Sequence, residues 1–517
     1  MNTTMHVPGT PLAAAPLHAP LPMAHADVDR AQWSAAAAAV RAAGGRLVSL
    51  WAGPGAGGVA AHVALAGRTG LLWLTLPPSL AEGGFPDLAE VFPNATRLQR
   101  TAADLSGLGA AGAADTRPWL DHGLWGEGGP PLRRPPGPST GAAPGTLPAD
   151  YAFVPVDGDG VHEIAVGPVH AGIIEPGHFR FSVVGEKVLR LEQWLGYVHK
   201  GIGRRFTELE PLRAHRLAGR ISGDSTVAHA WAYCMALEGA CGCTPPPRAQ
   251  ALRALLLERE RVANHLGDLG ALGNDAAFAF ALAHFSRLRE DWQRLSRDVF
   301  GHRLLMDLVV PGGVAVDPDP EALAAIAAQC EAVARELADL RSVLDEHAGV
   351  QDRFRTTGRV TPELAARLGL SGLAGRASGQ PFDLRCDHPW PPYDRLGVRK
   401  VVHADGDVAA RVAVRFDEVA ESLRLVRLLC AGLPPASSQA EPVVPSGAAR
   451  GAGWVEGWRG PVLCALELDG GAIACCHTAD PSWHNWPVLE HAVIGNIVPD
   501  FPLINKSFNL SYSGHDL

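Results

Sequence analysis

The chain has 517 residues, a length that predicts two or three domains. Its 54 acidic residues outnumber 45 basic ones, and the formal charge of −9 gives no broad electrostatic attraction for nucleic acid. No apolar run reaches the roughly 18 residues that a membrane-spanning helix needs. Nine cysteines in so long a chain do not indicate a disulfide framework, and their spacing does not match a structural zinc site.

The first part of the chain is predicted to hold one small domain between two irregular segments. Residues 1–25 lack the basic segment and apolar core of a secretion signal and are predicted to be disordered. Residues 26–125 are predicted to form an α+β domain, with an alanine-rich helix over 28–43 and a buried strand over 70–76. Residues 126–160 are crowded with proline and glycine and are predicted to be a linker.

Residues 161–517 are predicted to form a mainly helical bundle with small β elements, so the overall fold class is α+β. Apolar residues recur at three- and four-residue spacing in five segments, which we expect to be helices: 226–238, 248–269, 276–300, 320–347 and 408–428. We expect β-hairpins at 179–191 and 462–476, the second preceded by a connector over 433–453.

The segment from Arg220 to His229 carries the most informative pattern. It reads Arg-Ile-Ser-Gly-Asp-Ser-Thr-Val-Ala-His and resembles the Arg-x-Cys-Gly-x-Cys-x-x-x-His motif of nickel–iron hydrogenase large subunits. Ser222 and Ser225 stand where that family has cysteines. A thiolate is a soft, anionic metal ligand, whereas a serine hydroxyl stays protonated near neutral pH and binds such a metal poorly.

The C-terminal segment shows the same replacement. Hydrogenase large subunits carry an Asp-Pro-Cys-x-x-Cys element near their end, and the alignment puts Ser511 and Gly514 on its two cysteine positions. All four metal ligands of the family are therefore replaced, and we expect neither a nickel–iron centre nor any other metal. Because sites in helical bundles form between facing helices, we expect the Ser222 loop and the Ser511 tail to be neighbours in space.

Further family markers occur in the same order as in these relatives. Residues 167–170 resemble the Gly-Pro-x-His loop shared by hydrogenase large subunits and the 49-kDa-type, quinone-site subunit of respiratory complex I. The other markers are 197–201, 247–250 with Glu258, Arg261, Asn264 and His265, and 376–379 with 383–385. Residues 175–180 and the additional N-terminal domain are similar to the formate-hydrogenlyase and hydrogenase-4 branch. Residues 91–107 partly resemble the 30-kDa-type subunit of complex I.

The converging segments are expected to form a cavity that handles protons or quinone. The side chains offered to it are those of His170, Arg220, Asp224, His229, Asp500 and Asp516. Buried together, such groups would shift one another's pKa values. The resemblance implies that His170 reaches a quinone headgroup.

Each of these side chains also has a purely structural interpretation. His170 could cap its own loop, and His229 could be a satisfied core histidine. Ser222 and Ser225 could cap the helix that follows them. Arg220 is expected to pair with a buried carboxylate whether or not the site is active.

The resemblance implies a subunit of a complex-I-related, membrane-associated oxidoreductase. Its expected partners are an iron–sulfur subunit with a 4Fe–4S cluster and membrane-arm subunits of the antiporter type, with no cofactor held by this chain itself. We expect it on the cytoplasmic side of the bacterial inner membrane. Two alternatives remain: a non-catalytic scaffold in such a complex, and a hydrogen-evolving large subunit, against which the four replaced ligands argue.

Overall fold

The computed structural model describes residues 5–6, 12–55, 57–123, 125, 128–134, 151–171 and 174–517. The N-terminal part is a six-stranded sheet in the order β1-β2-β3-β6-β5-β4, with β3 and β6 parallel. Its strands are β1 Met5–His6, β2 Ala13–Pro16, β3 Met23–Asp27, β4 Arg46–Gly55, β5 Gly58–Gly67 and β6 Gly70–Leu76. The predicted buried strand over 70–76 is confirmed, since every residue of β6 is buried.

Two helices cover one face of this sheet. Helix α1 (Arg30–Ala42) begins at a capping box in which Asp29 and Gln32 bind each other's backbone N–H groups. Helix α3 (Ala95–Ser106) ends at Gly107, whose φ of +70° favours glycine. The remaining short elements here are α2 Pro78–Ala81, the paired strands β7 Phe85–Pro86 and β8 Ala110–Ala111, and η2 Pro131–Arg133.

The prediction that residues 1–25 are disordered is wrong for residues 13–25. Strand β2 pairs with β3, and β3 pairs with β6 over residues 23–27. These short strands carry no recognisable alternation of their own, and they are held by partners distant in sequence. Residues 1–4 and 7–11 lie outside the described residues. So does most of the predicted linker over 126–160, since residues 135–150 are not described.

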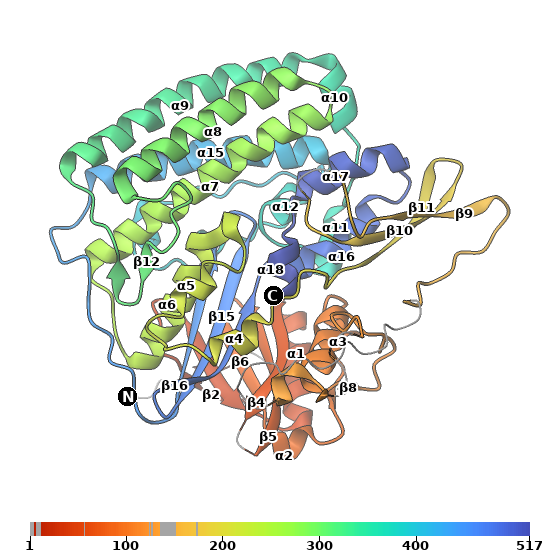
Figure 1. Cartoon of the computed structure of the whole chain (residues 1–517), viewed down its shortest axis with the longest axis vertical. Helices are drawn as coiled ribbons and strands as arrows, with labels where there is room; N and C mark the ends of the chain where they lie inside the picture. The colour runs from red at the N-terminus through yellow and green to blue at the C-terminus, as the bar shows by residue number, and fades with distance from the viewer. Residues whose placement is uncertain are drawn as a thin grey trace.

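The second part begins with a three-stranded sheet in the order β11-β10-β9. Its strands are β9 Val161–Val166, β10 His178–Val184 and β11 Lys187–Trp194, and the expected hairpin between β10 and β11 is confirmed. Figure 1 shows this sheet projecting from the body of the molecule.

Long helices form the main layer of the second part (Figure 1). They are α6 Thr226–Cys241, α7 Pro247–Asp275, α8 Ala279–Phe300, α9 Pro320–Glu346 and α15 Val408–Ala431, and each predicted helix is confirmed. Strands β12 (Val309–Val310) and β13 (Gly313–Val314) form a small hairpin between α8 and α9. No helix among the described residues is both long and apolar enough to cross a membrane.

Short helices lie between the long helices and strands of the second part. They are α4 Ile202–Phe206, α5 His215–Ala218, η3 Gly223–Ser225, α10 Ala348–Phe354, α11 Pro362–Leu368, α12 Gly372–Ala377, α13 Leu384–Asp387, α14 Tyr393–Leu396, α16 Ser482–Ala492, η4 Val498–Asp500, α17 Phe501–Phe508 and α18 Tyr512–Asp516.

A second central sheet joins the two parts of the chain. Its strands are β14 Ala449–Glu456, β15 Pro461–Asp469 and β16 Ala472–Ala479, in that order. The expected terminal hairpin is confirmed, and β14 adds a strand at the end of the predicted connector. Gly453 lets α6 lie directly on β14, because a Cβ there would come within 1.9 Å of the Ala232 carbonyl oxygen.

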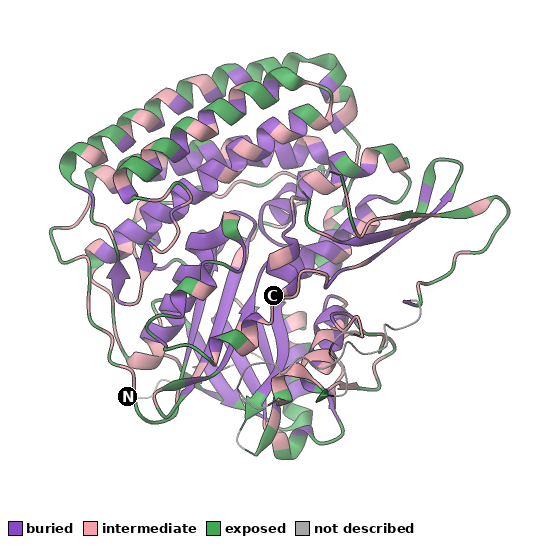
Figure 2. Ribbon diagram, in the orientation of Figure 1, coloured by how far each residue is buried: buried purple, intermediate pink, exposed green. Residues whose placement is uncertain are grey.

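The two central sheets meet at His477. Its ring stacks on Trp51 of β4 with ring centres 4.3 Å apart, and its Nε2 lies 2.8 Å from the Ser49 hydroxyl. Figure 2 shows the strands and the helices against them as mostly buried, while the outer helices expose one side. The α+β class is therefore confirmed, and the N-terminal unit packs directly on the second part.

Candidate functional site

The loop before α6 and the C-terminal tail meet in the interior, as predicted. The Ser222 and Ser511 hydroxyl oxygens are 2.8 Å apart, and both residues are buried. Ser511 also accepts a hydrogen bond from the Gly514 N–H, which starts α18. We call the side chains of Ser222, Asp224, Ser225, Arg459 and Ser511 the hydroxyl cluster.

Arg459, in the turn between β14 and β15, organises this cluster. Its guanidinium forms a bidentate ion pair with the Asp224 carboxylate and donates a hydrogen bond to the Ser225 hydroxyl at 3.2 Å. Ser222 donates to the same carboxylate at 2.7 Å. Burial alone would raise the pKa of Asp224, but the facing guanidinium and the Ser222 hydroxyl lower it to about 2, so this carboxyl is ionised.

The interpretation that Ser222 and Ser225 cap α6 is wrong. Neither side chain accepts a hydrogen bond from the backbone N–H groups that follow it. Glu260 of α7 takes that role instead, accepting from the N–H groups of Val227 at 2.6 Å and Ala228 at 3.2 Å. The two serine hydroxyls are thereby left for Asp224, Arg459 and Ser511.

His229 and Asp480 form a second buried pair beside the cluster. His229 Nε2 lies 3.2 Å from Asp480 Oδ2, and both side chains are almost fully buried. Burial raises the pKa of Asp480, but His229 and Arg459 outweigh burial and hold the pKa below its ordinary value. His229 Nδ1 has no hydrogen-bond partner. The interpretation of His229 as a satisfied core histidine therefore holds for one ring nitrogen only.

Asp480 was not identified from the sequence. It follows strand β16 and precedes Pro481, outside any family marker, and its position beside His229 depends on the packing of α6 against this strand's end. The signal that was available is weak: a carboxylate placed directly after a buried strand.

Lys200 joins the two converging loops. Its ammonium donates to the carbonyl oxygens of Ile221 at 3.1 Å and Ser513 at 3.0 Å. Burial lowers its pKa, while nearby carboxylates partly oppose this shift. The sequence marks this position only because lysine stands where the family usually has arginine.

A four-thiolate metal site does not fit these residues. A Cβ added at Gly514 would lie 2.9 Å from both Asp480 Oδ2 and Ser511 Oγ, so a cysteine there would force its neighbours to move. The hydroxyls of Ser222 and Ser511 hydrogen-bond to each other, and the Asp224 carboxylate forms an ion pair with Arg459. Neutral hydroxyls are also poor ligands for a soft metal. Among the residues that the structure describes, no group of three or more His, Cys, Asp or Glu side chains could hold a metal ion.

Two predicted members of the cavity lie elsewhere. Arg220 points outward and forms a bidentate pair with Asp307 at 2.6 and 2.8 Å, and its side chain is 46% exposed. Arg220 was expected to pair with a buried carboxylate, but its partner Asp307 is partly exposed. Asp500, at the start of α17, pairs with Arg353 at 3.3 Å. A sequence motif fixes the spacing of residues along the backbone but not the direction of their side chains. Here the turn before Ser222 directs the Arg220 side chain to the surface.

Asp516 and His170 border the cluster without joining it. Asp516 is fully buried, accepts from the Val198 N–H at 3.0 Å and lies 2.8 Å from His515 Nδ1. His170 Nε2 lies 2.8 Å from the Gly177 carbonyl oxygen in its own loop, a contact that agrees with a loop-capping role. The same loop reaches the tail, because Glu175 accepts from the Ser513 N–H at 3.1 Å.

A separate buried network links the helices behind the cluster. Arg376 binds Glu418 and Glu456 at 2.8 Å each, and Arg385 binds Glu258 at 3.1 Å. We call this set the ion-pair network: Glu258, Arg261, His265, Arg376, Asp383, Arg385, Glu418 and Glu456. All of its members are buried. It contains six residues of the family markers that the sequence showed: Glu258, Arg261, His265, Arg376, Asp383 and Arg385.

Comparisons with known proteins show which proteins the chain is similar to. Residues 272–450 match the family described as the 49 Kd subunit of respiratory-chain NADH dehydrogenase. The carbon monoxide-induced hydrogenase of Rhodospirillum rubrum is 31% identical over 67% of this chain and 97% of its own length. Formate hydrogenlyase subunit 5 of Escherichia coli is 30% identical over 84% of this chain and 77% of its own.

A solved structure shares the fold. A chain of the membrane-bound sulfane sulfur reductase, an archaeal respiratory membrane complex, superposes with a TM-score of 0.65 at 26% identity, over 70% of this chain and 100% of that one. The motif order, the meeting of the two degenerate half-sites and these similarities lead to one assignment. The chain belongs to the family that joins the 49-kDa-type subunit of respiratory NADH dehydrogenase with hydrogenase large subunits of the formate-hydrogenlyase type.

Proposed function

We propose that this chain is a peripheral subunit of a membrane-associated, complex-I-related oxidoreductase that works without a nickel–iron centre. It would lie beside an iron–sulfur subunit carrying a 4Fe–4S cluster and against membrane-arm subunits, on the cytoplasmic side. The relatives named above, as hydrogenase, formate hydrogenlyase and respiratory membrane complex subunits, support the type of assembly. The hydroxyl cluster would take part in proton transfer in place of hydrogen chemistry.

The observation that carries this proposal is the hydrogen bond between Ser222 and Ser511. It closes the place where the family's thiolates would converge, with oxygen in place of sulfur at 2.8 Å. Each hydroxyl can both donate and accept a hydrogen bond, unlike a thiolate bound to a metal. The site is therefore suited to moving protons and unsuited to binding a soft metal.

The hydroxyls form a continuous chain toward the surface. Asp224 accepts from Ser222 at 2.7 Å, Ser222 binds Ser511 at 2.8 Å, and Ser513 follows at a longer 3.5 Å. Ser513 lies on the tail next to the exposed Glu175. A row of hydroxyls can pass a proton by successive rotation, and the ionised, partly exposed Asp224 carboxylate lies at the other end of this row to attract it.

A scaffold without catalytic function is the second candidate. The contact of His170 with its own loop and the pairing of Asp224 with Arg459 both favour it, because paired groups stabilise a fold without any proton transfer. The two candidates differ in what the removal of a single hydroxyl would do.

Purification of the intact complex through a tag on this chain tests both candidates. We expect co-purifying iron–sulfur and membrane subunits and no nickel by elemental analysis; stoichiometric nickel would overturn the proposal. After reduction with dithionite, Ser511→Ala should slow electron transfer to decylubiquinone by about a hundredfold and change its solvent isotope effect.

Two further variants complete this test. Ser34→Ala, at an exposed position on α1, is the matched control and should transfer electrons at the wild-type rate. His170→Ala reports separately on quinone contact and should also lower the rate. Full rates in both Ser511→Ala and His170→Ala would establish the scaffold instead.

A further inference from the structure

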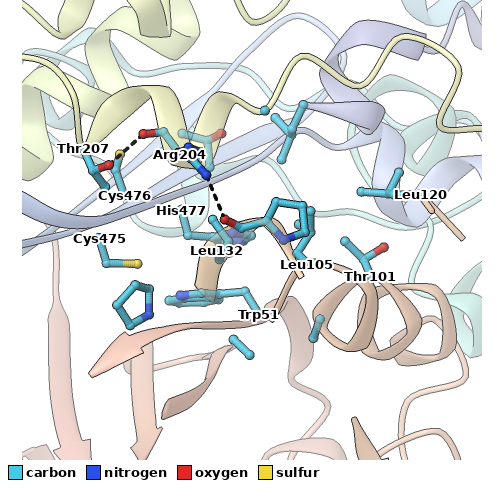
Figure 3. Close-up of a pocket in the computed structure, with 18 of the residues that line it drawn as sticks. Trp51, Thr101, Leu105, Leu120, Leu132, Arg204, Thr207, Cys475, Cys476 and His477 are labelled. Atoms are coloured by element: carbon cyan, nitrogen blue, oxygen red, sulfur yellow. Dashed lines mark hydrogen bonds between the residues drawn. The ribbon is translucent and has the colours of Figure 1, made fainter. Parts of the chain in front are cut away.

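A cavity of about 460 Å³ lies between the N-terminal unit and the second part, away from the hydroxyl cluster. Trp51 of β4 and Leu98 and Leu105 of α3 form one side, and residues 473–478 of β16 form the other. The segment after Lys200, including Arg204 and Thr207, covers it together with Leu132 (Figure 3). Protein interiors rarely leave voids much larger than a water molecule, and this volume falls in the range of small-molecule sites.

Two hydroxyl groups on the wall have no partner. Thr478 Oγ1 and Thr101 Oγ1 are buried and make no hydrogen bond, although both residues line the cavity. Thr478 is 3% exposed, so water does not reach it freely. A buried hydroxyl left unsatisfied destabilises the fold, and a polar group on a bound molecule would remove this cost.

The histidine and cysteine side chains of this wall are uncharged, although Arg134 and Arg204 also line the cavity. Burial lowers the pKa of His477 to about 3, so its ring is neutral. Burial also raises the pKa values of Cys475 and Cys476, which keeps both thiols protonated. The cations at the edge bind backbone carbonyl oxygens, Arg204 that of Pro131 at 3.4 Å and Arg134 that of Gly129 at 2.7 Å.

We propose that this cavity binds an uncharged, mainly aromatic or aliphatic small molecule that bears a hydroxyl or carbonyl group, with Thr478 and Thr101 as its hydrogen-bond partners. The edge of the Trp51 ring, whose faces stack on His477 and His62, and the side chains of α3 would contact its apolar body. Because β4 and β16 supply opposite walls, such a ligand would also fasten the N-terminal unit to the second part. This inference does not depend on the proposed function.

Fluorescence titration of the full chain with the neutral dye N-phenyl-naphthylamine tests occupancy. We expect saturable binding to the wild type. Ala102→Trp should abolish it, because Ala102 lines the cavity and is buried. Ala38→Trp, at an exposed position on α1, is the matched control and should bind as the wild type does. If Ala102→Trp does not fold, as judged by thermal melting, Leu105→Trp fills the same space with a smaller change in volume.

A pair of competitors tests the role of the hydroxyl. β-Naphthol and β-methylnaphthalene have nearly the same shape, and only the first can hydrogen-bond. In the wild type, β-naphthol should displace the dye at a concentration about tenfold lower. Thr478→Val keeps the side-chain shape and should remove this preference. No saturable dye binding, undiminished binding in Ala102→Trp, or an unchanged preference in Thr478→Val would each overturn the proposal.

Discussion

The ion-pair network is buried throughout and the hydroxyl cluster is buried except for the partly exposed Asp224, yet the two are built on different chemistry. The network sets three guanidinium groups against four carboxylates, whereas the cluster has one such pair, Arg459 with Asp224, surrounded by serine hydroxyls. The network holds α7, α12, α13 and α15 together and needs no metal. The cluster occupies the place where relatives would hold one. In this chain, the charged framework therefore surrounds a centre built of hydroxyls and one ion pair.

The largest effect is expected when the network loses one cation. Arg376→Met leaves Glu418 and Glu456 without their closest guanidinium, and uncompensated buried charge should destabilise the fold by about 3–5 kcal/mol. Thermal or chemical unfolding of the purified chain measures this. Arg335→Met, at an exposed position on α9, is the matched control and should leave the unfolding midpoint unchanged. A small loss at Arg376 would mean that the network does not stabilise the bundle.

Glu260 lies between the two regions and should give a clear pH signature. Burial raises its pKa from 4.5 to about 8, more than its two backbone hydrogen bonds lower it. The folded state therefore keeps a proton that the unfolded state loses. This contribution to stability is fully present below the unfolded pKa and is lost as the pH rises through the folded value.

Glu260→Gln should remove this loss, while its single amide oxygen keeps one of the two acceptors, the one for Val227. Relative to the wild type, it should gain about 2–3 kcal/mol between pH 5 and pH 8, after allowance for relaxation around the buried group. Unfolding midpoints at the two pH values measure the gain. Glu260→Ala, which also loses the acceptor, should be destabilised at both. An equal effect of Glu260→Gln at both pH values would contradict the assignment.

How far the sequence predicts this molecule differs between backbone and side chains. The helices, the two hairpins and the meeting of Ser222 with Ser511 follow from periodicity and from the family resemblance. Three side-chain features do not follow from them: the outward direction of Arg220, the pairing of Asp480 with His229, and the contact of Lys200 with both converging loops. These depend on the packing of segments that are distant in the chain, 87 residues apart for Arg220 and Asp307, 251 for His229 and Asp480 and 313 for Lys200 and Ser513, which local spacing does not contain. The short strands β2 and β3 were missed for the same reason.

A smaller effect is expected where the cluster is most tightly packed. Gly514→Ala places a methyl group 2.9 Å from Asp480 and Ser511 and should destabilise the fold by about 1–2 kcal/mol. Gly223→Ala, in the facing loop, meets no atom within 4 Å and is the matched control. Both variants can be compared by thermal unfolding. If Gly514→Ala is neutral, the site has room for a larger side chain, and the argument against four thiolates is weakened.

The smallest effect should come from Arg220, whose pairing with Asp307 lies at the surface. Because solvent screens this pair, Arg220→Ala should cost less than about 0.5 kcal/mol and should leave electron transfer in the intact complex at the wild-type rate. A strong loss of electron transfer in Arg220→Ala would show that the side chain turns inward in the complex and that the cluster includes one more cation. Unchanged electron transfer together with unchanged stability would confine the charge of the cluster to the pair formed by Arg459 and Asp224.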